Sequence, residues 1–174
     1  APLTNLAGFL KHPLLAPVVT FMGDPRKRTR MLAAISGLLI AFAQPPFGFL
    51  PGLLGYGLLL YALECHLGNW PKRTAFFMGW LAGFCYFLVS CFWVAEAFLV
   101  DAEKFLWALP FAVTLLPAAV AVYFALAAML AKFFWFSGFR RVLALVICLS
   151  LAEWLRGHLF TVFPWNLMGE SFHA

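Results

Sequence analysis

Two long apolar runs constrain this sequence more than any other feature. Residues 74–100 form a 27-residue apolar segment interrupted only by Glu96, and residues 105–130 form a second apolar segment. A helix needs about 20 apolar residues to cross a bilayer. Only 11% of the residues are charged and 64% are hydrophobic, whereas about a quarter of the residues of a soluble domain are charged. The sequence therefore predicts an all-α, polytopic transmembrane helix bundle.

About five spans can be placed along the chain. A basic leader at residues 1–30 is predicted to be cytoplasmic or interfacial. A transmembrane helical domain is predicted at residues 31–166, followed at residues 167–174 by an extracytoplasmic end that we expect to be truncated. The predicted spans are residues 31–43, 47–63, 74–100, 105–130 and 142–163. The first two are short and are joined by the uncharged turn Gln44-Pro45-Pro46, so a re-entrant hairpin is the alternative there.

The positions of the basic residues predict the orientation. If the amino terminus is cytoplasmic and the chain crosses five times, ten of the 12 Lys and Arg residues flank the cytoplasmic ends, and only Lys104 and Arg156 lie on the other side. Basic residues concentrate in cytoplasmic loops. This distribution favours topology over a nucleic-acid-binding role, because the charges flank apolar runs and form no single patch.

The stretch from Glu153 to Asn166 places polar groups where the preceding apolar run predicts lipid. A charge at the bilayer centre costs roughly 2.5–3.5 kcal/mol, so such a cluster must pair, reach an interface or line a wet cavity. Glu153 and Arg156 are three residues apart and share one face of a helix. A purely structural pair and a pair that contacts lipid both fit this spacing. His158 is expected at the end of the helix, near the interface.

Other polar patterns are weak. The residues Glu64-Cys65-His66 are expected in a loop between spans, because consecutive side chains point in different directions and form no metal or nucleophile site. The four cysteines are scattered and are interpreted as small apolar packing residues. Gly79 and Gly83 are four apart, a spacing that permits close helix contact. The sequence indicates no metal, no cofactor and no catalytic residue.

The Glu153 motif carries a resemblance to a known family. The sequence Glu153-Trp-Leu-Arg-Gly-His-Leu-Phe-Thr-Val-Phe-Pro-Trp-Asn-Leu-Met-Gly169 resembles the signature of bacterial apolipoprotein N-acyltransferase, which has Glu-x-Leu-Arg-Gly followed by Thr-Gly-Phe-Pro-Trp. The segments 43–49 and 79–94 resemble other parts of the family, so the resemblance covers roughly residues 31–174. Val162 replaces the usual Gly before Phe-Pro-Trp, and Glu170 stands where Tyr often follows Gly169.

The resemblance implies a multi-pass enzyme of the bacterial inner membrane, with its amino terminus cytoplasmic and the carboxyl end of this chain periplasmic. Such an enzyme moves an acyl chain from a phospholipid to the N-terminal amine of a diacylglyceryl-cysteine lipoprotein. A cysteine thiolate is acylated first, and the amine then attacks the thioester. In the family a Glu-Lys-Cys triad lies in a periplasmic nitrilase-like domain beyond the sixth span, so we expect this chain to be an N-terminal fragment that is inactive alone.

With the catalytic triad in another domain, the resemblance implies that the membrane helices of this chain hold and orient lipids. Glu153 and Arg156 are the candidates for contact with a lipid or substrate, with Arg156 meeting a phosphate or carboxylate, and Trp165 and Asn166 are the candidates for positioning at the interface. The expected partners are a phospholipid acyl donor, a lipoprotein acceptor and membrane lipids. The alternative is a non-enzymatic membrane protein, such as a small transporter or scaffold, whose intramembrane Glu/Arg pair marks a path.

Overall fold

The computed structural model describes residues 24–67, 71–100, 102–136 and 138–159, and these residues form helices and no strands. Some predictions fall outside the described residues: most of the leader (residues 1–23), the positioning residues Trp165 and Asn166, and the extracytoplasmic end (residues 167–174). The elements are α3 (Pro25–Phe42), the 3-10 helix η1 (Leu50–Leu53), α4 (Leu54–Leu67), α5 (Lys72–Ser90), α6 (Trp93–Leu99), α7 (Ala102–Phe105), α8 (Leu109–Phe133) and α9 (Arg140–His158). The all-α prediction is confirmed for the described residues.

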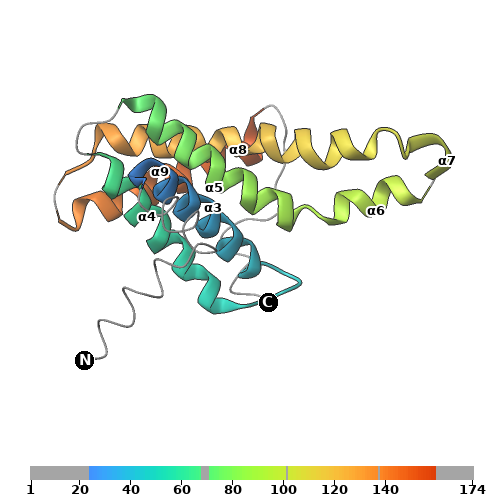
Figure 1. Cartoon of the computed structure of the whole chain (residues 1–174), viewed down its shortest axis with the longest axis horizontal. Coiled ribbons are helices and arrows are strands. Elements are labelled where there is room, and N and C mark those ends of the chain that lie inside the picture. Colours follow the sequence, from blue (N-terminus) through green and yellow to red (C-terminus); the bar gives the residue numbers. More distant parts are fainter. Residues whose placement is uncertain (1–23, 68–70, 101, 137, 160–174) are drawn as a thin grey trace, which may run out of the picture.

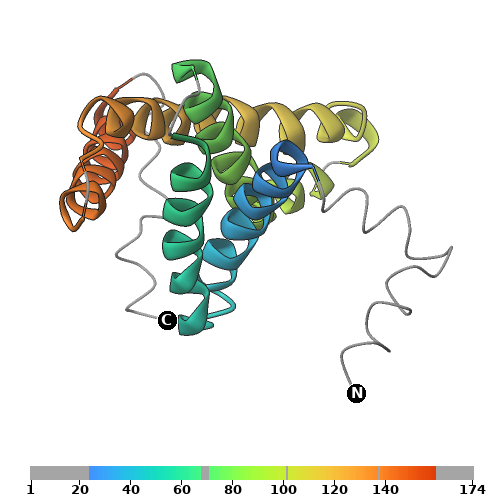
Figure 2. The ribbon, with the colours of Figure 1, turned by 60° about the vertical axis from the view of Figure 1, so that its left-hand side comes forward.

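The centre of the bundle is the pair α5 and α8. α3 packs on α5, α4 packs on α3, and α9 packs against α8, where its first residues also reach the end of α4 (Figures 1 and 2). The buried aromatic rings of Tyr86 and Phe87 on α5 meet Phe124 on α8, with ring centroids 5.6 and 5.7 Å apart respectively. This aromatic cluster fixes the interface on which the other helices are assembled.

Small residues allow these helices to approach closely. A Cβ atom at Gly79 would lie 2.5 Å from the carbonyl oxygen of Phe124, and a Cβ atom at Gly37 would lie 2.1 Å from the carbonyl oxygen of Ala82. Neither position can hold a side chain without moving a neighbouring backbone. The prediction of close helix contact at Gly79 and Gly83 is confirmed, since Gly83 packs in the same way against Phe124.

Among the described helices, α5 with 19 residues and α8 with 25 are long and apolar enough to cross a membrane. The segment Leu50–Cys65 is a shorter apolar helix. α9 has 19 residues, but charged residues lie near both of its ends. These features are consistent with a helical membrane protein.

The predicted span at residues 74–100 contains two helices. α5 ends at Ser90, and α6 begins at Trp93 after a turn at Cys91 and Phe92. Beyond this turn α6, α7 and the first part of α8 extend past the other helices as a projecting hairpin (Figure 1). The hairpin exposes Trp93, Val100, Leu106 and Trp107.

The ends of several helices meet at one end of the bundle. Arg141 at the start of α9 forms an ion pair with Glu64 in the last turns of α4. The Lys72 ammonium lies 3.9 Å from the ring centroid of Phe133, and the Arg30 guanidinium lies 5.3 Å from that of Phe77. The prediction of a loop at Glu64-Cys65-His66 is therefore wrong. α4 continues through these residues to Leu67, and Glu64 forms its ion pair with Arg141 of α9.

Candidate functional site

Arg156 lies at the centre of the candidate site. Its side chain is only 1% exposed, and its Nη2 atom is 3.9 Å from Oε1 of Glu153, whose side chain is 16% exposed. The guanidinium carbon also lies 5.1 Å from the centroid of the Phe87 ring on α5, which is a cation–π distance. The spacing of three residues thus brings the predicted pair together, and the last turns of α9 bring a cation against the aromatic cluster of α5 and α8.

Two tyrosines border the Glu153/Arg156 pair. Tyr56 on α4 and Tyr86 on α5 are close enough to both residues for electrostatic interaction. Sequence reasoning missed both, because each lies in an apolar run without any charged neighbour at helical spacing. Their involvement follows from where α4 and α5 lie relative to the last turns of α9, which one sequence does not reveal. The site therefore combines side chains from three helices.

Near its last residue, α9 is held by polar contacts. Nδ1 of His158 lies 2.8 Å from the carbonyl oxygen of Trp154, and the two rings stack with centroids 4.5 Å apart. The Tyr123 hydroxyl of α8 donates a hydrogen bond to the carbonyl oxygen of Leu159 at 3.2 Å. The expected helix-end position of His158 is confirmed, since α9 ends there. Trp165 and Asn166 lie beyond the described residues.

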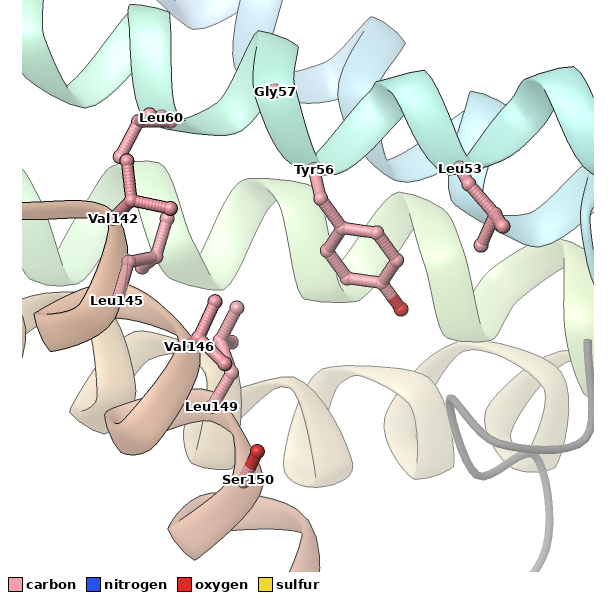
Figure 3. Close-up of a pocket in the computed structure, with 9 residues that line it drawn as sticks. All are labelled: Leu53, Tyr56, Gly57, Leu60, Val142, Leu145, Val146, Leu149 and Ser150. Carbon is pink, nitrogen blue, oxygen red and sulfur yellow. The ribbon is translucent and has the colours of Figure 1, made fainter. Parts of the chain in front are cut away.

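An apolar cavity of about 390 Å³ separates α4 from α9. From α4 it is lined by Leu53, Tyr56, Gly57 and Leu60, and from α9 by five residues between 142 and 150. In Figure 3 the Tyr56 side chain leaves α4 and directs its hydroxyl into the space between the helices. This hydroxyl is buried and forms no hydrogen bond with any described residue.

Other reactive side chains offer no second site in the described part of the chain. Cys91 and Cys148 are buried within the hydrophobic core, as expected of packing residues, while Cys85 is half-buried and Cys65 is exposed. No cluster of His, Cys, Asp and Glu side chains suitable for a metal ion occurs among the described residues.

Comparison with known proteins shows which family the sequence resembles. Residues 36–174 match the family model described as the apolipoprotein N-acyltransferase N-terminal domain. The chain is 48% identical over 143 residues to the apolipoprotein N-acyltransferase of Caulobacter vibrioides, which covers 82% of this chain and 27% of the relative. It is 41% identical over 149 residues to that of Allorhizobium ampelinum, with 82% and 28% covered.

A relative from Sinorhizobium fredii, with the same name, extends the match to 165 residues at 42% identity, covering 91% of this chain and 30% of the relative. The chain thus spans less than a third of the length of these relatives. No solved structure matches it. The family model covers most of the chain and includes the whole Glu153–Gly169 motif, so this chain belongs to the apolipoprotein N-acyltransferase family, of which it carries the N-terminal domain.

Proposed function

We propose that this chain is the membrane domain of an enzyme that transfers an acyl chain from a phospholipid to the N-terminal amine of diacylglyceryl-cysteine lipoproteins. The observation that carries the proposal is the family match over residues 36–174, which includes the Glu/Arg motif on α9. An intramembrane Glu/Arg pair alone would also fit a small transporter or scaffold, but the family match gives that alternative no support.

The proposed setting is the bacterial inner membrane, crossed five times by residues 31–43, 47–63, 74–100, 105–130 and 142–163. The leader at residues 1–30 is then cytoplasmic and the segment 167–174 is periplasmic. Support comes from the length of α5 and α8 and from the basic ends of α3, α5 and α9, which gather at one end of the bundle. The positive-inside rule assigns that end to the cytoplasm.

The proposed role of Glu153 and Arg156 is to bind the polar end of a lipid. A buried guanidinium is a strong donor to phosphate or carboxylate oxygens, and the adjacent carboxylate holds it in place while reducing its net charge. Trp165 and Asn166 are proposed to position the chain at the outer interface. Because α9 is apolar from Val142 to Ala152, a lipid lying along it would bring its headgroup to this pair.

Acyl transfer itself is proposed to use a thioester on a cysteine outside this chain. Cys91 and Cys148 are buried in the core and Cys85 is half-buried, while Cys65, which is exposed, lies at the proposed cytoplasmic end, away from the Glu153/Arg156 pair. The contribution of this domain is then to bring lipid to the nucleophile and to hold it there. We expect the isolated chain to have no acyltransferase activity.

A domain exchange tests this proposal. The equivalent segment of the Caulobacter vibrioides relative is replaced by this chain, and the hybrid is produced in cells depleted of their own enzyme. N-acylation of a reporter lipoprotein is read by mass spectrometry. The hybrid should restore N-acylation, while this chain alone should not. Failure of a stably inserted hybrid, or turnover by the isolated chain, would contradict the proposal.

A further inference from the structure

The cavity between α4 and α9 is apolar along its length and polar at one end. Val142, Leu145, Val146, Leu149 and Ser150 of α9 line it. Their spacing of three and four residues marks one face of the helix. The next residue on this face is Glu153, followed by Arg156, so the apolar wall leads directly to the ion pair. At 1.5 Å per residue, the distance along α9 from Val142 to Glu153 is about 16 Å.

The opposite wall has the same polarity. Leu60 of α4 faces Val142 in Figure 3, while Tyr56 lies one turn nearer the amino end of α4, on the side of Leu149 and Ser150. Beyond Leu60 and Val142 the two helices are tied together by the Glu64–Arg141 ion pair. Glu64 and Arg141 thus lie beyond the Leu60/Val142 end of the cavity, and Tyr56 and Ser150 line it toward the other end, from which α9 continues to Glu153 and Arg156.

The buried Tyr56 hydroxyl points to a ligand. Among the described residues it has no hydrogen-bond partner, although leaving a buried hydroxyl unpaired is unfavourable. A bound molecule that carries an acceptor next to an apolar chain would satisfy it. The volume of about 390 Å³ lies within the usual range of small-molecule sites, roughly 300–1,000 Å³.

We propose that this cavity binds one ester-linked acyl chain of a glycerolipid. The methylene chain lies between Leu60, Leu145 and Leu149, and the ester carbonyl oxygen accepts a hydrogen bond from Tyr56. The polar remainder of the lipid then extends toward Glu153 and Arg156. This assignment rests on the proposed function for its biological meaning, but the binding itself does not depend on acyl transfer.

Photo-crosslinking in nanodiscs tests the site with the 174-residue chain. The probe is phosphatidylethanolamine with a diazirine near the end of one acyl chain, and the labelled residues are mapped by mass spectrometry. Labels are expected at Leu60, Val142 and Leu145. A second probe is a diacylglyceryl-cysteinyl lipopeptide with the same diazirine chain, because both lipids contain an acylglycerol ester. The probe that labels these residues identifies which lipid supplies the acyl chain. If neither probe labels them, the proposal is overturned.

Three variants complete the test. Val146→Trp should block the cavity and reduce labelling at least fivefold, whereas Val122→Trp on α8, which lines no described cavity, should not. Tyr56→Phe should weaken binding of the ester probe about threefold to tenfold, the value of one hydrogen bond, and should not affect an ether-linked probe.

Stability supplies an independent readout. Since the Tyr56 hydroxyl bonds to no described residue, Tyr56→Phe should leave the melting temperature in lipid-free detergent unchanged or raise it. A marked loss of stability would make the hydroxyl structural and overturn its assignment to a ligand. The domain-exchange hybrid can show normal N-acylation while the Val146→Trp and unaltered proteins are labelled equally. That result would refute this site and leave the proposed function intact.

Discussion

At the scale of single residues, Arg156 illustrates what spacing can predict. The interval of three residues indicated that it shares a helix face with Glu153, and the two side chains do approach to 3.9 Å. The nearly complete burial of Arg156 and its contact with Phe87 could not be predicted, because they depend on how α5 packs beside α9. The same limit applies to Tyr56, since Glu153 and Arg156, with which it interacts electrostatically, lie on another helix.

Replacing Arg156 should destabilise the fold. Arg156→Ala removes the cation that offsets Glu153 and leaves a void beside Phe87, so we expect a loss of about 3 kcal/mol in the free energy of unfolding. Arg156→Lys keeps the charge and should lose less. The measurement is reversible unfolding in mixed micelles. Equal stability of Arg156→Ala and the unaltered chain would show that the buried pair contributes nothing to the fold.

At the scale of the helices, most segments could be predicted from apolar run length, but their ends could not. α3 begins at Pro25, six residues before the predicted span, because the Asp24 side chain accepts a hydrogen bond from the Arg26 amide and proline suits the first turn. These signals are readable in the sequence. The turn at Cys91 and Phe92 is not, because the apolar run continues through it without glycine or proline.

The contact between α5 and α8 predicts opposite effects for two glycines. Gly79→Ala places a methyl group 2.5 Å from the Phe124 carbonyl oxygen and should cost about 1–3 kcal/mol. Gly57→Ala on α4 meets no atom within 4 Å and should stabilise the helix by up to about 1 kcal/mol. Unfolding of both variants in the same detergent checks the difference. A Gly79→Ala chain as stable as Gly57→Ala would mean that α5 and α8 are not so closely packed.

At the scale of the whole molecule, the distribution of charge predicted the end of the bundle at which basic residues gather. Arg30, Lys72 and Arg141 come from α3, α5 and α9, yet each contacts a neighbouring helix at that end. The order in which the helices pack could not be predicted, because each apolar face can bury itself against several others. The five-crossing proposal requires these three basic residues to lie at one end of the bundle.

Thiol labelling tests that topology. Cys65 is exposed and lies beside Glu64 at the basic end, so it should react with a membrane-impermeant maleimide only after the cytoplasmic side is opened. A Ser171→Cys variant in a Cys65→Ser background, within the proposed periplasmic segment 167–174, should react in intact spheroplasts. Three crossings separate the two positions in the proposed topology. Labelling of both from the same side would contradict it.

The hairpin that extends past the bundle divides α8 into two parts. Buried residues of α8 begin at Pro117 and continue to Ala131, whereas none lies between Leu109 and Leu116. Local opening is easier where few side chains are buried. In detergent, the amide protons of residues 113–116 should therefore exchange with deuterium faster than those of residues 120–131. One continuous helix would thus open locally at two different rates. It would open slowly where it is packed between α5 and α9, and faster where it extends past the bundle.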